Sequence, residues 1–198
     1  MGRWKPDGRG RLEQAALELY LERGFERTSV AEIAERAGLT ERTFFRHYAD
    51  KREVLFAGAD ELRELLADAV ARAPGSAPPM EIAAAALRAA AVPMQERREQ
   101  ARRRQAVIAA TPELQERELI KLASLSAALA EALRRRGVDD ASAGLAAEVG
   151  IAVFKVAFLR WIEQAEQAGE QAGESGERDL ARFIDESFAG LTTVIAGT

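Results

Sequence analysis

The apolar residues of this chain recur at the spacing of an α-helix along nearly its whole length, and this pattern limits the possible folds most strongly. Strict alternation of apolar and polar residues is rare, β-branched residues are sparse, and Ala, Leu, Glu and Arg dominate. The chain has 198 residues, of which 47% are hydrophobic, and this is enough to bury a core. The sequence therefore predicts an all-α protein of about nine helices.

Capping and helix-breaking residues divide the N-terminal part into short predicted helices. After a first helix with one apolar stripe, Ser29 begins a capping box for a second helix, which Gly38 ends. Thr40 is in position to cap a short third helix, which contains the only histidine. Asp50 has the same cap-to-Glu spacing as Ser29, so we expect one continuous fourth helix as far as a Pro- and Gly-rich linker.

Longer helices are predicted beyond that linker, separated by Pro93, Thr111-Pro112, Gly137 and a polar, Gly-rich connector. The connector, between residues 166 and 177, is expected to be a flexible loop without chemistry. The pattern predicts an N-terminal arm with a helix-turn-helix domain, a connecting helix and a C-terminal helical domain, over residues 1–50, 51–73 and 74–198.

Composition argues against most enzyme chemistry. The chain has no Cys and a single His, which removes thiolate nucleophiles, disulfides and zinc–thiolate sites and disfavours a multi-His metal site. Glycine motifs that bind nucleotides are absent as well. We therefore expect no catalytic residues, no metal site and no cofactor. The lack of Cys fits a cytoplasmic protein, and no uncharged apolar run is long enough for a membrane span.

The second and third predicted helices have the features of a helix-turn-helix, in which the second helix of the pair enters the major groove of DNA. Ala34 and Ala37 are small enough for close packing, and Gly38 allows a tight turn between the helices. Phe44 and Tyr48 lie one turn apart and are expected to point inward. The outward face then holds polar and basic side chains, namely Glu41, Arg42, Thr43, Arg46 and His47.

A series of spaced landmarks extends through this region. They are Gly24-Phe25, Thr28-Ser29-Val30, Ile33-Ala34, Ala37-Gly38-Leu39-Thr40, Thr43-Phe44-Phe45-Arg46-His47-Tyr48 and Lys51 through Leu55. Together they resemble the N-terminal domain of the tetracycline-repressor (TetR) family, over residues 10–57. The remainder of the chain agrees with the family only in helical content and length. The resemblance implies a dimeric bacterial transcription regulator, usually a repressor that a small molecule releases from DNA.

Carried over by position, the resemblance also implies a set of contacts with double-stranded DNA. Thr28 and Thr40 should bond phosphates, and Arg42 is best placed to pair with guanine. Glu41 could accept a hydrogen bond from cytosine or could only favour the helix N-terminus. Phe45 stands where the family commonly has Tyr, so we expect packing or a thymine-methyl contact there. Further DNA contacts are implied for Thr43, Arg46, His47 and Lys51, although Thr40, His47 and Lys51 could instead have purely structural roles.

Two predicted helices near the C-terminus are apolar around most of their circumference. Residues 145–162 hold only three charged side chains, and the last helix carries two adjacent apolar stripes. We expect these helices to pair with their two-fold copies as a four-helix bundle, the usual dimer interface of the family, although a thick monomeric core is the alternative. A two-fold homodimer predicts a palindromic operator. The expected interface residues are Leu145, Val149, Val153, Val156, Leu180, Ile184, Leu191 and Ile195.

By resemblance, a ligand pocket should lie among the helices that span residues 80–162. Met and aromatic side chains suit an adaptable apolar cavity, so we expect a mainly hydrophobic effector. The expected lining residues, which could instead simply pack the core, are Met80, Leu87, Met94, Arg103, Val107, Ile108, Leu119, Leu122, Phe154, Phe158 and Trp161.

The identity of the effector has two open alternatives. Residues 103–114 also resemble family members with an acyl-CoA-like ligand domain. A cluster of arginines could hold a coenzyme A phosphate at the mouth of a pocket or could be a solvated helix face, and its members are Arg97, Arg98, Arg102, Arg103 and Arg104. The other possibility is a DNA-binding protein that responds to no effector, acting as a fixed repressor or an architectural factor.

Overall fold

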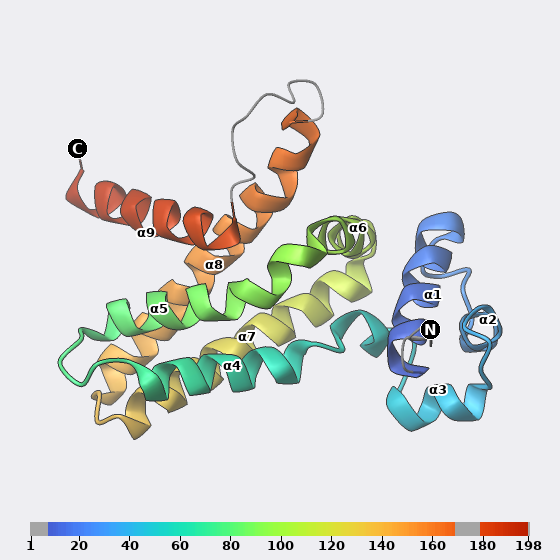
Figure 1. Cartoon of the computed structure of the whole chain (residues 1–198), viewed down its shortest axis with the longest axis horizontal. Helices are drawn as coiled ribbons and strands as arrows, with labels where there is room; N and C mark the ends of the chain where they lie inside the picture. Colours follow the sequence, from blue (N-terminus) through green and yellow to red (C-terminus); the bar gives the residue numbers. More distant parts are fainter. Residues whose placement is uncertain (1–7, 169–178, 198) are drawn as a thin grey trace, which may run out of the picture. The chain divides into compact units, whose positions relative to one another are not determined.

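The computed structural model describes residues 8–168 and 179–197, and within these ranges it contains helices and no strand (Figure 1). The predicted all-α class is therefore confirmed. The connector predicted between residues 166 and 177 lies, beyond Ala168, outside the described residues. The elements are α1 (Gly8–Arg23), α2 (Val30–Arg36), α3 (Glu41–His47), the 3-10 helix η1 (Glu53–Phe56), α4 (Ala59–Arg72), α5 (Pro79–Ala91), the 3-10 helix η2 (Val92–Arg97), α6 (Arg98–Ala109), α7 (Pro112–Arg135), α8 (Asp140–Ala168) and α9 (Leu180–Ala196).

The chain divides into two compact units, and this division differs from the one expected from sequence. The N-terminal unit comprises Met1–Gly58 and Arg103–Ile120, and the C-terminal unit comprises Ala59–Arg102 and Lys121–Thr198. The turn between α6 and α7 thus belongs to the N-terminal unit, because Val107, Ile108 and Leu114 are buried in the same apolar core as α1, α2 and α3. A contact between segments so far apart in sequence leaves no local pattern that could predict it.

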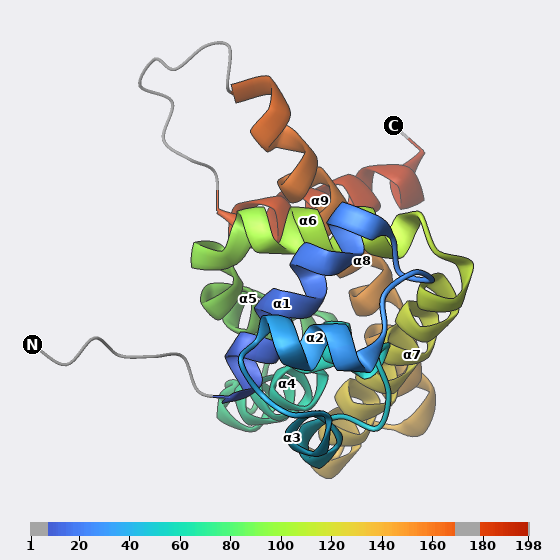
Figure 2. The same ribbon diagram turned by 90° about the vertical axis from the view of Figure 1, so that its right-hand side faces the viewer.

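In the N-terminal unit, helices α1, α2 and α3 pack around one apolar core (Figure 2). Phe44 and Tyr48 are buried in this core, as the sequence predicts. The small side chains of Ala34 and Ala37 are buried as well, which allows α2 to pack closely. Because Phe44 points inward, the opposite side of α3 is exposed.

The predicted continuous fourth helix is wrong. A short 3-10 helix, η1, is followed by a break at Ala57-Gly58, and α4 begins only after it. Arg104 donates through Nε to the carbonyl of Leu55, and Arg9 donates to the carbonyl of Ala57. A continuous α-helix would pair these carbonyls with N–H groups four residues further on. Side chains from distant segments therefore replace the helical hydrogen bonds, and the local sequence pattern gives no sign of this.

In the C-terminal unit, α5 lies side by side with α4 and also packs against α8 and α9 (Figure 1). Trp161 is fully buried in the core of this unit, together with Leu87 and Leu129. Helices α5 and α8 approach closely at Gly150, where an added Cβ would lie 3.4 Å from Cδ1 of Leu87. Gly150 thus permits the close approach of α5 and α8.

Helix α8 is long and apolar enough over Asp140–Gln164 to cross a membrane, judged by length and composition alone. The core helix of a soluble protein meets the same criteria. Of the most apolar window, 44% is buried inside the protein, and α8 supplies Phe154, Ala157 and Trp161 to the C-terminal core. Packing in the core therefore explains part of the apolar character of α8, and a single helix of this kind is weak evidence for a membrane.

Candidate nucleic-acid interface

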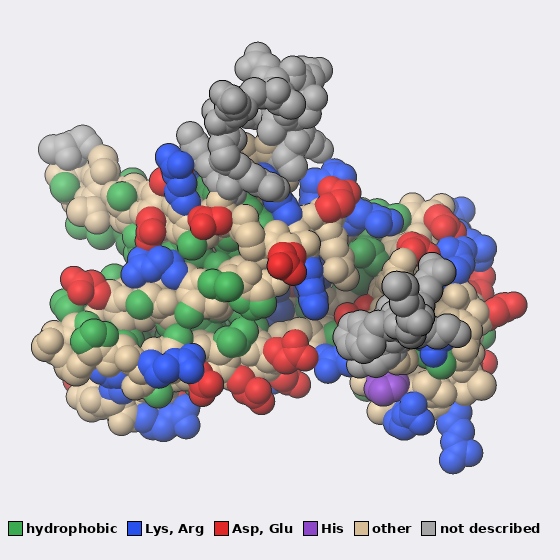
Figure 3. Space-filling view, in the orientation of Figure 1, with side chains coloured by type: hydrophobic (Ala, Val, Ile, Leu, Met, Phe, Trp, Pro, Cys, Tyr) green, Lys and Arg blue, Asp and Glu red, His purple; other side chains and the backbone are tan. Residues whose placement is uncertain are grey.

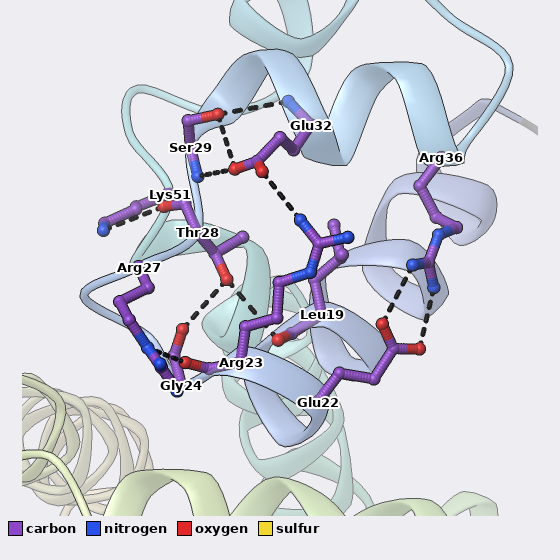
Figure 4. Close-up of polar contacts among 10 residues, drawn as sticks. All are labelled: Leu19, Glu22, Arg23, Gly24, Arg27, Thr28, Ser29, Glu32, Arg36 and Lys51. Carbon is purple, nitrogen blue, oxygen red and sulfur yellow. Dashed lines mark hydrogen bonds and ion pairs between the residues drawn. The ribbon is translucent and has the colours of Figure 1, made fainter.

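A capping box begins α2, as the sequence predicts. The backbone N–H of Glu32 donates to Ser29 Oγ at 3.2 Å, and the backbone N–H of Ser29 donates to Glu32 Oε2 at 2.9 Å (Figure 4). These bonds satisfy N–H groups that have no partner within the helix. The pKa of the Glu32 carboxyl is lowered mainly because it accepts hydrogen bonds from the backbone N–H and the hydroxyl of Ser29. The start of α2 is therefore fixed by a local signal.

The turn between α2 and α3 is closed by glycine and by an arginine from α1. Gly38 has a φ of +66°, a left-handed conformation that favours glycine. The N–H of Leu39 donates to the carbonyl of Ala34 at 2.8 Å, and Arg11 Nη1 donates to the carbonyl of Ala37 at 3.0 Å. Arg11 therefore stabilises the end of α2, a role that the sequence pattern did not indicate.

Helix α3 begins at an N-cap and divides into an inward and an outward side. The backbone N–H of Thr43 donates to Thr40 Oγ1 at 3.2 Å, which confirms the capping role of Thr40. Phe44 is fully buried on the inward side. The outward side exposes the predicted group, since Thr43 is half-buried while Glu41, Arg42, Phe45, Arg46 and His47 are exposed.

The exposed side of α3 combines hydrogen-bond donors with one aromatic ring. Arg42 and Arg46 are four residues apart, so they lie on the same face of the helix. Arg46 Nη2 lies 3.4 Å from His47 Nε2. Phe45 is 56% exposed and contacts Phe44 edge-on, with a centroid distance of 5.5 Å. In the view of Figure 3, Lys and Arg side chains stand close to the histidine on this unit.

Two residues that the resemblance assigns to DNA have partners inside the protein. Thr28 is only 2% exposed, and its hydroxyl donates to the carbonyl of Gly24 at 2.9 Å. A direct phosphate contact by this side chain is therefore contradicted, because the hydroxyl is buried and engaged. Lys51 is half-buried, and its Nζ donates to the carbonyls of Phe25 and Thr28.

Basic residues are frequent near the start of α1 and around α3, and two of them, Arg9 and Arg52, form internal ion pairs. Arg9 pairs with Glu13 at 3.3 Å. Arg52 pairs with Asp50 and, at 3.1 Å, with Glu113 of α7. The hydrogen bond from Arg52 is the largest cause that lowers the pKa of Asp50. Arg3 and Lys5 lie outside the described residues. The basic surface that remains exposed in the helix-turn-helix is therefore centred on α3.

The sequence did not reveal that two arginines of the α6–α7 segment belong to this unit. Arg117 Nε pairs with Glu53 Oε1 at 2.6 Å, and Arg104 Nη2 pairs with Glu118 at 2.9 Å. Both guanidinium groups lie over the ring of Phe56, at 4.8 and 4.9 Å from its centroid. They hold the segment that follows the helix-turn-helix. No local motif could have indicated this, because Arg104 lies 49 residues from its acceptor Leu55 and Arg117 lies 64 residues from Glu53.

The residues expected to line a ligand pocket do not form one group. Val107 and Ile108 are wrong as lining residues, because they pack the core of the N-terminal unit. Leu119 is 61% exposed. Arg103 also falls in the N-terminal unit, whereas Leu87 lies in the core of the C-terminal unit and Met80, Met94, Leu122, Phe154, Phe158 and Trp161 lie in or against that core. The arginine cluster proposed for coenzyme A is likewise divided between internal pairs, such as Arg102 with Glu99.

Aromatic residues of α8 do come together, however. Phe154 stacks on Phe158 with a centroid distance of 6.3 Å, and Phe158 lies 5.9 Å from Trp161. The guanidinium of Arg98 lies over the Trp161 ring at 5.6 Å and also donates to the carbonyl of Trp161. The buried indole N–H of Trp161 has no acceptor among the described residues.

The residues expected at the dimer interface divide between surface and core. Val153, Leu180 and Ile184 are buried within the chain, so the structure contradicts their assignment to an interface. Leu180 and Ile184 belong to the core of the C-terminal unit. Leu145, Val156 and Ile195 are exposed, and Val149 and Leu191 are half-buried. Helices α8 and α9 thus carry apolar side chains both in the core and on the surface of the protomer.

Comparison with known proteins accounts for most of the chain. Residues 13–57 match the bacterial regulatory proteins of the TetR family, and residues 77–196 match the MftR C-terminal domain. The chain is 38% identical over 81 residues to the HTH-type transcriptional regulator TcmR of Streptomyces glaucescens. This match covers 41% of the chain but only 36% of TcmR.

Solved structures share the fold over nearly the whole length. The triclosan complex of SmeT, the repressor of the Stenotrophomonas maltophilia multidrug efflux pump SmeDEF, matches with a TM-score of 0.58 and 22% identity, over 92% of this chain and 90% of SmeT. A TetR-family regulator from Mesorhizobium loti matches with a TM-score of 0.56 and 20% identity, over 94% of this chain and 96% of that protein. The matched domains and the shared fold identify this chain as a member of the TetR family of bacterial transcriptional regulators, with a C-terminal domain of the MftR type.

Proposed function

We propose that this protein binds a palindromic DNA operator as a homodimer, with α3 of each protomer in the major groove. We propose further that it acts in the cytoplasm as a repressor, and that a small, mainly hydrophobic effector releases it from the operator. Family membership makes a regulator the expected class, and an enzyme is not expected.

The two-sided character of α3 is the observation that best supports DNA binding. One side is fixed by Phe44 in the core, and the other exposes Arg42 and Arg46 on a helix whose start is fixed by the Thr40 cap. A guanidinium group can pair bidentately with the O6 and N7 atoms of guanine. A rigid helix that presents such groups is therefore suited to the edges of bases in the major groove.

Selection from random-sequence duplexes tests the operator proposal. We expect the wild-type protein to enrich an inverted repeat whose half-sites lie about one helical turn of DNA apart or a multiple of it. Enrichment of a single unrepeated site would contradict the symmetric arrangement. Enrichment of no motif would contradict sequence-specific binding altogether.

An apolar stripe on α8 supports the homodimer. Leu145, Val149, Ala152 and Val156 recur at helical spacing, and Leu145 is 67% exposed. A groove of about 370 Å³ lies between α5 and α9, and it is lined in part by Phe188, Leu191 and Ile195. Apolar patches of this kind mark protein interfaces.

Sedimentation in solution tests the dimer directly. We expect a species with twice the protomer mass of 21.6 kDa at micromolar concentration. A single species of protomer mass would contradict the dimer, and with it the prediction of a palindromic operator.

The aromatic cluster of α8 supports a mainly hydrophobic effector. Phe154, Phe158 and Trp161 offer apolar contact area, and the buried indole N–H of Trp161 can donate to an acceptor on the ligand. An apolar molecule with one hydrogen-bond acceptor fits this combination.

Thermal-shift measurements with fatty acids, acyl-CoAs and drug-like aromatic compounds test the effector proposal. A true effector should raise the melting temperature of the free protein and weaken operator binding reciprocally. The Trp161→Phe variant, which keeps an aromatic ring but lacks the N–H, should respond less than the wild type. Operator affinity that no compound changes would instead support a fixed repressor or an architectural protein.

A further inference from the structure

The side chain of Lys51 is engaged by the turn that connects α1 to α2. Its Nζ donates to the carbonyl of Thr28 at 3.0 Å (Figure 4). It also donates to the carbonyl of Phe25 at 2.9 Å and lies 3.5 Å from the carbonyl of Glu26. The same ammonium group lies 4.3 Å from the centroid of the Phe25 ring. An ammonium group has three N–H donors. The turn thus offers an acceptor for each of them, two at short distance and one at long distance.

The backbone of Lys51 is held as well. The hydroxyl of Tyr20 donates to the carbonyl of Lys51 at 2.6 Å, and Tyr20 packs edge-on against Phe25 with a centroid distance of 5.2 Å. Burial raises the pKa of Tyr20 well above its ordinary value, so this hydroxyl stays protonated and able to donate. Lys51 is therefore attached to α1 through its carbonyl and to the turn through its ammonium group.

The turn between α1 and α2 is irregular, so its carbonyls lack the regular hydrogen bonds of a helix. Gly24 has a φ of +87°, and its carbonyl accepts from the Thr28 hydroxyl at 2.9 Å. The carbonyl of Thr28 lies just before Ser29, the N-cap of α2, and receives a hydrogen bond from Lys51. Carbonyls outside regular helices are paired by N–H groups of the turn, as that of Phe25 is by the N–H of Thr28 at 3.2 Å, or by side chains and water. Lys51 supplies these bonds at the point where the chain enters the helix-turn-helix.

We propose that Lys51 is a positioning residue for DNA recognition, which fixes the α1–α2 turn, and through it α2 and α3, without itself neutralising a phosphate. This inference rests on the proposed DNA-binding function and replaces the phosphate contact that the family resemblance implies. The two roles differ in a measurable way. A lysine that neutralises a phosphate releases condensed counterions from DNA, whereas a lysine that makes no phosphate contact leaves the salt dependence unchanged.

The salt dependence of DNA affinity separates the two roles. The full chain is titrated with a random-sequence 30-base-pair duplex and with the selected operator, and log K is plotted against log salt concentration. We expect Lys51→Met to bind the operator about 10-fold more weakly, with the wild-type slope. Arg46→Ala, the positive control, should make the slope shallower by about 0.9. Arg72 is an exposed residue of α4, so the variant Arg72→Met removes the same charge as Lys51→Met at a position away from the turn and serves as the control for net charge.

A second variant tests the turn without changing charge. Thr28→Val removes the hydroxyl that donates to Gly24 and keeps the shape of the side chain, so it should also weaken operator binding at an unchanged slope. If Lys51→Met does not fold, Lys51→Gln replaces it in the same titrations. Amide hydrogen exchange should be faster at residues 25–30 of the Lys51 variant than in the wild type, and unchanged in α9.

Each outcome bears on a separate claim. A slope that falls by about 0.9 in the Lys51 variant would overturn the positioning role and restore the phosphate contact. Wild-type affinity together with wild-type exchange in that variant would also overturn it. Failure of the wild-type protein to prefer any sequence would contradict the proposed function and not the role of Lys51 in the turn, which the exchange measurement reports independently.

Discussion

Helices α3 and α8 each present a face that the protomer leaves exposed, but the two faces have opposite chemistry. The outer face of α3 carries Arg42, Arg46 and His47, whereas that of α8 carries Leu145, Ala152 and Val156. Cationic hydrogen-bond donors suit phosphates and base edges. An apolar stripe gains from being removed from water against a second apolar surface. The two regions therefore point to partners of different kinds, DNA for α3 and a second copy of the chain for α8.

This difference also shows that local arrangement carries more information than total charge. The whole chain has a formal net charge of −4, which gives no sign of a nucleic-acid partner. Much of the basic charge beside the helix-turn-helix is neutralised by neighbouring carboxylates, as in the pairs of Arg36 with Glu22 and of Arg52 with Asp50. The basic side chains of α3 stand out because the core orients them away from such partners.

The largest expected effect concerns the inner side of α3, which holds the outer side in place. Phe44→Ala should destabilise the N-terminal unit by about 3–5 kcal/mol, because it leaves a cavity in a closed core. Phe45→Ala, at the adjacent and mostly exposed position, should change stability by less than about 0.5 kcal/mol. Denaturant unfolding measures both. Equal losses would show that the two sides of α3 are not distinct.

The exposed stripe of α8 is tested by placing a charge within it. Val156→Asp should convert the dimer to a monomer and weaken operator binding about 100-fold, because the two half-sites are then bound independently. Leu119→Asp is a matched control on α7, since Leu119 is 61% exposed and Val156 is 53% exposed. Sedimentation and operator titration provide the measurements. Dissociation of the dimer by both variants, or by neither, would break the contrast between α8 and the rest of the surface.

The two arginines of α3 should differ from each other. Arg42→Ala should reduce the preference for one base per half-site by about 1–3 kcal/mol. Arg46→Ala should weaken the operator and random DNA alike, with a shallower salt dependence. Competition titrations with single-base operator variants separate these outcomes. A uniform loss for Arg42→Ala on every sequence would exclude it from base recognition.

The parts of the fold that could be predicted from sequence are those that a few neighbouring residues decide. The Ser29 and Thr40 caps and the turn at Gly38 lie where the pattern places them, because each depends on bonds or dihedral angles within a short segment. The inward position of Phe44 could be predicted for the same reason, since helical spacing alone fixes it.

The parts that could not be predicted depend on distant partners. The break after η1 requires Arg104, which is 49 residues from Leu55 in the sequence. The bonds of Lys51 to the turn join residues more than 20 positions apart. Leu180 and Ile184 carry the same apolar pattern as the exposed residues of α9, and only tertiary packing decides which of them are covered. Periodicity identifies an apolar face but not the surface against which it packs.

The smallest expected effect concerns Thr40, the N-cap of α3, which lies at the beginning of the helix proposed to bind DNA. Thr40→Ala should cost about 1 kcal/mol of stability, because the N–H of Thr43 loses its cap. Thr40→Asp should keep that stability, since Asp is a good N-cap, but its added negative charge should weaken DNA binding if the residue faces a phosphate. Ser29→Asp, at the equivalent cap of α2, is the matched control, and unfolding and DNA titrations are compared for all three variants. Similar DNA affinities for the two Asp variants would leave Thr40 as a cap alone, whereas a selective loss for Thr40→Asp would place the beginning of α3 against the DNA backbone.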